Sequence, residues 1–207
     1  MGAGTGIVLA VMMLLLPTAF AEEVRVDIPP GWGKWQEVLR QRIDLGEVVA
    51  RIPAKQDMRT WTEGMEVTTL NLPSKKRETI VVSAIQESYK QAYAACEKLN
   101  VVTPKIQTAG DFAVAYGHAY CQGNRQHRMQ GRIEVYKVTA SATHVYVVKM
   151  IKVVPSLRIT DPSDTVTYKD EKEAKEAAAW LDRTGKFLLS SALVCPDKAT
   201  AKDKCAK

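Results

Sequence analysis

The sequence predicts an α+β fold: a mainly antiparallel sheet of about five strands with two principal helices, braced by disulfide bonds. Three observations support this prediction. Residues 105–154 contain three β-prone runs that only short polar connections separate. A helical pattern precedes them over 83–99, and a second helical pattern follows over 171–195. The chain also has 4 cysteines, and an even number of cysteines in an exported protein favours disulfide bonds.

Residues 1–21 have the features of a signal peptide. An apolar run over 7–16 ends at Pro17, and the Ala-Phe-Ala sequence over 19–21 fits the small-x-small pattern of a cleavage site. The apolar run is shorter than the roughly 20 residues that a membrane-spanning helix needs. We therefore expect cleavage near Ala21 and a periplasmic or secreted location. A retained membrane anchor is the alternative.

The remainder is predicted to form a single α+β domain over 22–196 and a polar, Lys-rich tail over 197–207. The formal net charge of the chain is +6. In an exported protein, this charge favours an anionic partner in the envelope over nucleic acid. An acidic protein is the first expectation, and a peripheral contact with lipid headgroups is the second. The sequence gives no indication of the oligomeric state.

Three elements are expected before the first long helix: a short edge strand over 24–28, a short helix over 34–42 and a strand over 61–72. The short helix is predicted because Trp35, Val38 and Leu39 share a face at helical spacing. The strand is predicted because Met65 and Val67 alternate with polar residues, and Pro73 ends the run. The stretch over 43–50 fits neither pattern clearly.

The first long helix is expected over 83–99, with Ile85, Ala92 and Cys96 on its apolar face and Asn100 as its C-cap. The β-branched residues over 79–82 leave its start less well defined. A strand then follows over 105–121, with a bend at Ala109-Gly110.

This strand has one face of large side chains and one face of small side chains, because side chains alternate between the two faces. The large face carries Phe112, Val114, Tyr116, His118 and Tyr120. The small face carries Ala113, Ala115, Gly117, Ala119 and Cys121. The small face is expected to pack against the helix over 83–99. The sequence leaves open whether the large face is buried or exposed.

Two further strands are expected over 132–140 and 143–154, joined by a tight turn at Ser141-Ala142. The second is nearly continuous in apolar residues, which is typical of a central strand covered on both faces. A short edge strand is expected over 165–168.

The last helix, over 171–195, is expected to begin at a capping box formed by Asp170 and Glu173. Its interior Gly185 suggests a close contact between this helix and the sheet. The predicted apolar face carries Ala174, Ala177, Leu181, Leu188 and Cys195.

The cysteines are expected to form the pairs Cys96–Cys121 and Cys195–Cys205. If the helix that carries Cys96 packs on the small strand face, its thiol meets that of Cys121. Cys195 at the helix end and Cys205 in the tail then make a local pair. The alternative pairs one of the first two cysteines with Cys195 or Cys205.

No cofactor, metal or catalytic residue is expected. His118 and Cys121 have the spacing of metal ligands, but an offset of three places them on opposite faces of a strand. His118 and His144 could lie near tyrosines on adjacent strands, and no carboxylate arrangement there resembles a general acid–base pair. We therefore predict that the protein is not an enzyme.

Binding is predicted at a basic loop and at the large strand face. The residues are Arg125, His127, Arg128 and Arg132 of the loop, and Tyr116, His118 and Tyr120 of the strand. Guanidinium groups suit carboxylate, phosphate or sulfate, although a loop of this composition can also be simply solvated. The leading hypothesis is an exported, non-catalytic protein-binding or assembly factor, with an inhibitor or immunity protein as a subclass. The alternatives are a small-ligand-binding protein that uses the aromatic face and, third, a hydrolase without a recognisable motif.

Overall fold

The computed structural model describes residues 23–72, 76–109, 112–123, 130–160, 165–190 and 192–195. The seven strands of the main sheet are β2 (Trp35–Ile43), β3 (Gly46–Pro53), β4 (Glu63–Leu70), β5 (Lys98–Ala109), β6 (Phe112–Gln122), β7 (Arg132–Ala140) and β8 (Val145–Val153). The helices are α1 (Arg77–Ala95), α2 (Glu171–Ser190) and the 3₁₀ helix η1 (Pro30–Trp32). The short strands are β1 (Glu23–Val26), β9 (Arg158–Thr160), β10 (Thr165–Thr167) and β11 (Ala192–Cys195).

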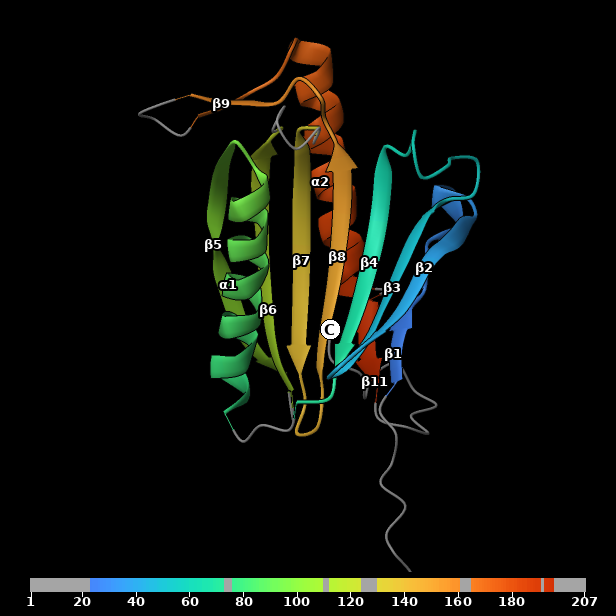
Figure 1. The fold of residues 1–207 in the computed structure, drawn as a ribbon, viewed down its shortest axis with the longest axis vertical. Helices are drawn as coiled ribbons and strands as arrows, with labels where there is room; N and C mark the ends of the chain where they lie inside the picture. The colour runs from blue at the N-terminus through green and yellow to red at the C-terminus, as the bar shows by residue number, and fades with distance from the viewer. Residues whose placement is uncertain are drawn as a thin grey trace, which may run out of the picture.

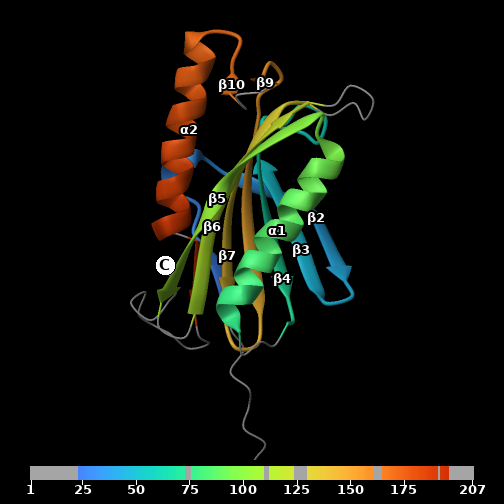
Figure 2. The ribbon, with the colours of Figure 1, turned by 90° about the vertical axis from the view of Figure 1, so that its left-hand side faces the viewer.

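The main sheet is antiparallel throughout, in the order β2-β3-β4-β8-β7-β6-β5. Figure 1 looks onto the side that carries α1, which we call the front face. Helix α2 lies on the opposite side, the back face, and Figure 2 shows the sheet between the two helices. The predicted α+β class is therefore confirmed, with seven strands in place of about five.

The small face of β6 packs against α1, as predicted. Val81 and Ile85 of α1 are fully buried against Ala113 and Ala115 of β6 and the facing residues of β7. These contacts explain why α1 begins at Arg77, before the predicted start at 83. The β-branched residues of its first turns are held in the helix by burial, which overrides their weak helix propensity.

Strands β7 and β8 are joined at Ser141–His144, where the backbone N–H of Ser141 donates to the carbonyl of His144 at 2.9 Å. Strand β8 is central, between β4 and β7, as predicted. The expected cover on both faces is incomplete, because Val147 and Lys149 on its front side are only partly buried. The predicted edge strand over 165–168 is also present as β10, paired with β9.

The predicted helix over 34–42 is wrong, because this segment is strand β2. Its residues pair with β3, from Trp35 opposite Pro53 to Ile43 opposite Gly46. The register shifts between Glu37 and Leu39, so one extra residue interrupts the alternation and gives the apolar residues a helix-like spacing. The ambiguous stretch over 43–50 belongs to the turn and the start of β3.

The first long helix ends at Ala95, short of the predicted Leu99 and its Asn100 cap. Cys96 already has an extended backbone, and Lys98–Ala109 forms β5, which pairs with β6 along most of its length. The expected single strand over 105–121 is thus two strands that fold back on each other. Leu99 to Val102 gain sheet partners that a continued helix would not offer.

Helix α2 ends at Ser190, and the residues predicted to extend it form β11. Strand β11 pairs with β1, so the predicted first strand lies outside the main sheet. At the other end of α2, the Asp170 half of the capping box is confirmed: the backbone N–H of Glu173 donates to Asp170 Oδ1 at 2.9 Å. The Glu173 carboxylate accepts from the backbone N–H of Lys169, one residue before the cap. The expected close contact at Gly185 is wrong, because a Cβ there would meet nothing within 4 Å.

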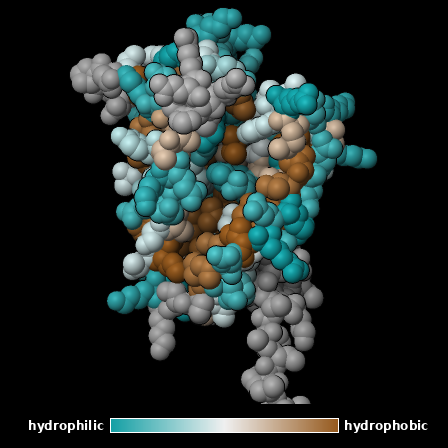
Figure 3. Space-filling model, in the orientation of Figure 1, coloured by the Kyte–Doolittle hydropathy of each residue, from teal (hydrophilic) through white to brown (hydrophobic). Residues whose placement is uncertain are grey.

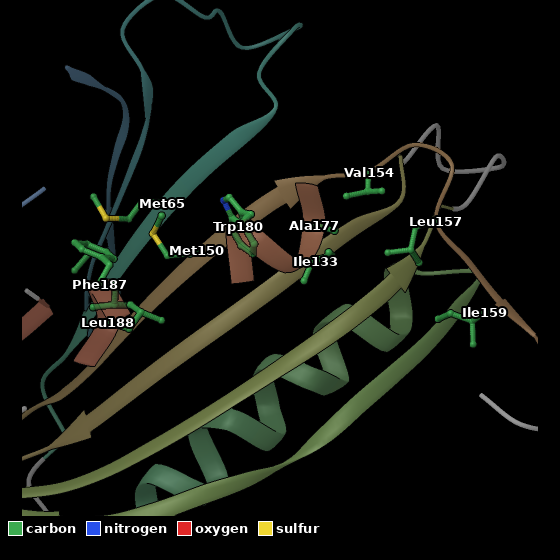
Figure 4. Packing of buried hydrophobic residues seen from close by; sticks show 12 residues of the cluster. Met65, Ile133, Met150, Val154, Leu157, Ile159, Ala177, Trp180, Phe187 and Leu188 are labelled. Atoms are coloured by element: carbon green, nitrogen blue, oxygen red, sulfur yellow. The ribbon is translucent and has the colours of Figure 1, made fainter. Parts of the chain in front are cut away.

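The larger core lies between α2 and the back face (Figure 4). The α2 side chains Ala177, Trp180, Phe187 and Leu188 share one buried cluster with Met65 and Val67 of β4, Ile133 of β7, and Val148 and Met150 of β8. Two of the residues predicted on the apolar face of this helix, Ala177 and Leu188, belong to the cluster. A third, Leu181, is only partly buried. Neither helix of the described ranges combines the length and apolar character that crossing a membrane requires.

Candidate functional site

The aromatic residues predicted to bind lie on the back face and are partly buried. Phe112 is 8% exposed and Val114 is fully buried, and Tyr116 packs against their cluster. Tyr120 packs against the large cluster beneath α2. The His118 ring meets the Tyr120 ring edge-on at 5.4 Å. The large face of β6 is thus core at one end and a half-buried row of rings at the other.

Burial changes the protonation behaviour of this row. It raises the pKa of Tyr116 to about 12 and lowers the pKa of His118. Within the described part of the chain, the buried Tyr116 hydroxyl has no hydrogen-bond partner. Lys137 of β7 lies over the Tyr116 ring, 5.7 Å from its centroid, and donates to the Leu188 carbonyl of α2 at 3.1 Å. Lys137 therefore ties the last turn of α2 to the sheet.

Of the predicted binding residues, the structure describes Arg132 and the three aromatic-row residues Tyr116, His118 and Tyr120, and it places Arg132 apart from that row. Arg125, His127 and Arg128 lie outside the described residues. Arg132 pairs with Cys121 in the sheet register, so its side chain belongs to the front face, whereas the aromatic row belongs to the back face.

The Cys96–Cys121 disulfide is present, as predicted. The two Cα atoms lie 5.5 Å apart, and the bond joins the end of α1 to β6. The second predicted pair is not tested, since Cys205 and the side chain of Cys195 lie outside what the structure describes.

The front face carries a groove. It lies between α1 and strands β2, β3 and β4, with a volume of about 370 Å³. In Figure 3, brown apolar surface lies in the hollow between α1 and the β2–β3 hairpin, with teal polar residues on both sides. Its floor comes from β4, β8 and β7, and its lining includes Ile43, Val48, Glu66, Thr68, Leu70, Ala84, Glu87, Gln91, Arg132, Glu134, Tyr136, Val147 and Lys149.

One part of the groove floor holds a buried carboxylate. Glu134 is only 2% exposed, and it accepts hydrogen bonds from Arg132 Nε and from the Tyr136 hydroxyl. Burial and the neighbouring Glu134 charge both raise the pKa of Tyr136, so this hydroxyl remains a donor. The arginine compensates the charge of the buried carboxylate. The Glu134 carboxylate is therefore held by a neighbour on each side.

A second ion pair crosses β4 and β8. Glu66 and Lys149 are opposite each other in the register, and Lys149 Nζ lies 3.0 Å from Glu66 Oε2. Both side chains are partly exposed. Toward the β2–β3 turn the lining becomes apolar, where Ile43 is 37% exposed. The groove therefore combines charged pairs with an apolar strip.

The groove exists because α1 lies tightly over one half of the sheet only. The Tyr89 hydroxyl lies over Gly117 of β6, where a Cβ would come within 2.3 Å of it. This hydroxyl donates to the Val102 carbonyl at 3.0 Å, and the Tyr89 ring meets the Tyr136 ring edge-on at 5.6 Å. Glycine at 117 thus permits the close approach that holds α1 over β5, β6 and β7.

Both edges of the main sheet carry features that oppose the addition of another strand. Register shifts interrupt β2 between Glu37 and Leu39, and β5 between Val102 and Lys105. The shift in β5 contains Pro104, which has no backbone N–H. Bulges, proline and charged side chains are common protections of edge strands. The front face is therefore better suited to binding than the edges.

The described residues form no arrangement with evident catalytic chemistry. They contain no group of three or more His, Cys, Asp or Glu residues that could hold a metal ion. His118 lies on β6, and His144 stacks on Tyr146 at the start of β8. Strand β7 separates them, so the expected neighbouring histidines on adjacent strands are not found.

Sequence reasoning missed the groove residues. Ile43 and Val48 lay in the stretch over 43–50 that fitted neither pattern, so their shared face could not be recognised. Glu66 and Lys149 had a usable signal: each is a charged residue inside a β-prone run. Their pairing could not be derived, because it depends on the register between β4 and β8.

Comparison with known proteins found no matching family model and no similar curated protein. The geometry of the groove therefore carries the functional argument.

Proposed function

We propose that this protein is an exported, non-catalytic binding protein that holds a segment of another protein in the front groove. The observation that carries the proposal is an apolar strip beside α1 that is only partly covered and is flanked by charged pairs. Apolar surface of this kind, rimmed by polar residues, is typical of interaction sites. Because both edges of the main sheet oppose the addition of another strand, a partner that binds on the front face of the sheet is favoured.

Export is part of this proposal. The Cys96–Cys121 disulfide is compatible with an oxidising compartment. An acidic partner remains a prediction that depends on Arg125, His127 and Arg128. The described groove lining itself carries three carboxylates and two cations.

Site-specific photocrosslinking tests the proposal. A benzophenone amino acid replaces Ile43 in the groove, in the full chain produced in its native host. The matched control places it at Ala179, on the exposed side of α2. We expect a discrete protein adduct from position 43 and none from position 179, and Val48→Glu should suppress the adduct. Equal adducts at both positions, or none at position 43, would count against the groove.

A small-ligand-binding role on the back face is the second candidate. The observation that favours it is the buried Tyr116 hydroxyl without a described partner, beside the half-buried rings of His118 and Tyr120. In that case Tyr116→Phe would abolish ligand binding while the crosslink at position 43 stays absent.

A further inference from the structure

The two faces of β4 and β8 carry the same arrangement of charges. On the back face, Glu63 and Lys152 are cross-strand neighbours, 3.4 Å apart. Arg183 of α2 contacts both Glu63 oxygens at 3.2 Å. Beside this cluster, the α2 side chains Trp180 and Leu188 cover the apolar residues of the same strands. A helix with an apolar stripe and a flanking arginine thus occupies the back face.

The front face repeats this pattern three residues along β4. Glu66 and Lys149 are again cross-strand neighbours, at 3.0 Å. The apolar residues Leu70 and Val147 lie farther along the same strands. Of the described residues, only Lys149 makes an ion pair with Glu66, so no residue there corresponds to Arg183.

The uncovered part of the sheet has the dimensions of one helix. Three strands spaced about 4.8 Å apart give a strip about 10–14 Å wide, and a helix with its side chains is about 10–12 Å across. The 8 residues of β4 extend for about 26 Å, which corresponds to about 17 residues of helix. A strand of the partner would instead seek a sheet edge, and both edges are blunted.

From this repetition we infer that the groove receives an amphipathic α-helix of the partner protein. Its apolar stripe lies on Val48, Leu70 and Val147, and an Arg or Lys on its flank meets Glu66. Glu87 on the α1 side of the groove also favours a cationic flank, since its ion pair with Lys90 is long and exposed. This inference rests on the proposed function and specifies the shape and charge of the segment bound.

Three synthetic peptides of 18 residues serve as probes. The first has Leu at helical spacing with Lys and Arg elsewhere, and the second has the same Leu positions with Glu elsewhere. The third has the composition of the first, with Leu at every second position. Backbone amide shifts of the whole protein are followed during titration with each peptide. We expect the first peptide to shift the amides of β3, β4 and β8 and to bind about fivefold more tightly than the second.

Charge reversal supplies the matched comparison. Glu66→Lys should weaken the first peptide about fivefold and favour the second, whereas Asp182→Lys, on the exposed side of α2, should change neither. Equal effects of the two variants would overturn the inference. Tighter binding of the third peptide in the groove would also overturn it and leave the proposed function standing. Failure of the crosslink at Ile43 would remove the proposed function itself.

Discussion

The same two strands, β4 and β8, are covered on the back face and open on the front face. On the back, α2 buries Met65, Val67 and Met150 and places Arg183 on Glu63. On the front, the alternate residues of these strands include Glu66 and Lys149, and Leu70 and Val147 remain only partly buried. Because side chains alternate, one register creates both surfaces. The comparison separates residues that stabilise the fold from residues available for a partner.

The largest expected difference between the faces is in stability. Trp180→Ala removes a side chain that is 2% exposed and should lower the free energy of unfolding by about 3–5 kcal/mol. Ile43→Ala, on the front, should cost about 0.5 kcal/mol or less, because this side chain is already partly exposed. Denaturant unfolding followed by circular dichroism measures both. Similar losses would mean that the front face is also part of the core.

Loss of the disulfide should have the next largest effect on the free energy of unfolding. The bond matters on the front face because α1 buries smaller side chains there than α2 buries on the back face. The bond closes a loop with a sequence separation of 25, and the double variant Cys96→Ala/Cys121→Ala should lose about 3 kcal/mol. The wild-type protein unfolded under reducing conditions should lose at least as much, because the predicted Cys195–Cys205 bond would be reduced as well. A loss below about 1 kcal/mol would show that packing alone holds α1 on the front face.

The buried charge of Lys137 on the back face should lower the free energy of unfolding at neutral pH. Lys137 is 1% exposed, and burial lowers its pKa to about 8 from an ordinary 10.5. The unfolded chain therefore binds more protons between these values, so stability should rise with pH through this window. Lys137→Met should be more stable than wild type by up to about 3 kcal/mol at pH 7.

The measurement for Lys137 is denaturant unfolding of both proteins at pH 7, 8, 9 and 9.5. The difference between them should shrink as pH rises above about 8. Above pH 10 the buried tyrosines act in the opposite direction, because burial raises the pKa of Tyr89 and Tyr116 to about 12. A difference that does not change with pH would exclude the buried charge as its cause.

The smallest effects concern the two ion pairs. Glu63→Gln breaks contacts with Lys152 and Arg183 and should cost about 1 kcal/mol. Glu66→Gln removes one partly exposed pair and should cost about 0.5 kcal/mol or less. Thermal unfolding compares the two. A larger loss for Glu66 would indicate that the front pair stabilises the fold and is not held for a partner.

Local patterns predicted much of the fold. Alternation in β6 predicted its small face, the packing of α1 on that face and the Cys96–Cys121 bond, because all three follow from side-chain direction. The cap at Asp170 was predicted because its signal lies within four residues.

The failures arose where distant partners decide the structure. Residues 34–42 have a helix-like apolar spacing and become a strand through β3, and the predicted helix end at 98–99 leaves the helix to pair with β6. The groove could not be predicted for the same reason, since its lining depends on which strands α1 covers. The predicted binding residues were selected by chemical type, and among those that the structure describes, the register places Arg132 on the face opposite Tyr116, His118 and Tyr120.

The β1–β11 ladder determines how the molecule responds to mechanical force. Glu23 lies opposite Cys195, and Val26 lies opposite Ala192, so the chain enters and leaves this ladder at the same end. A pull that separates Glu23 from Cys195 loads one pair at a time and peels the strands apart, starting at these two residues. The main sheet bears no load until this ladder has opened. If Glu23 and Cys195 were the points of attachment, tension would lengthen the molecule here first, while the groove beside α1 kept its shape.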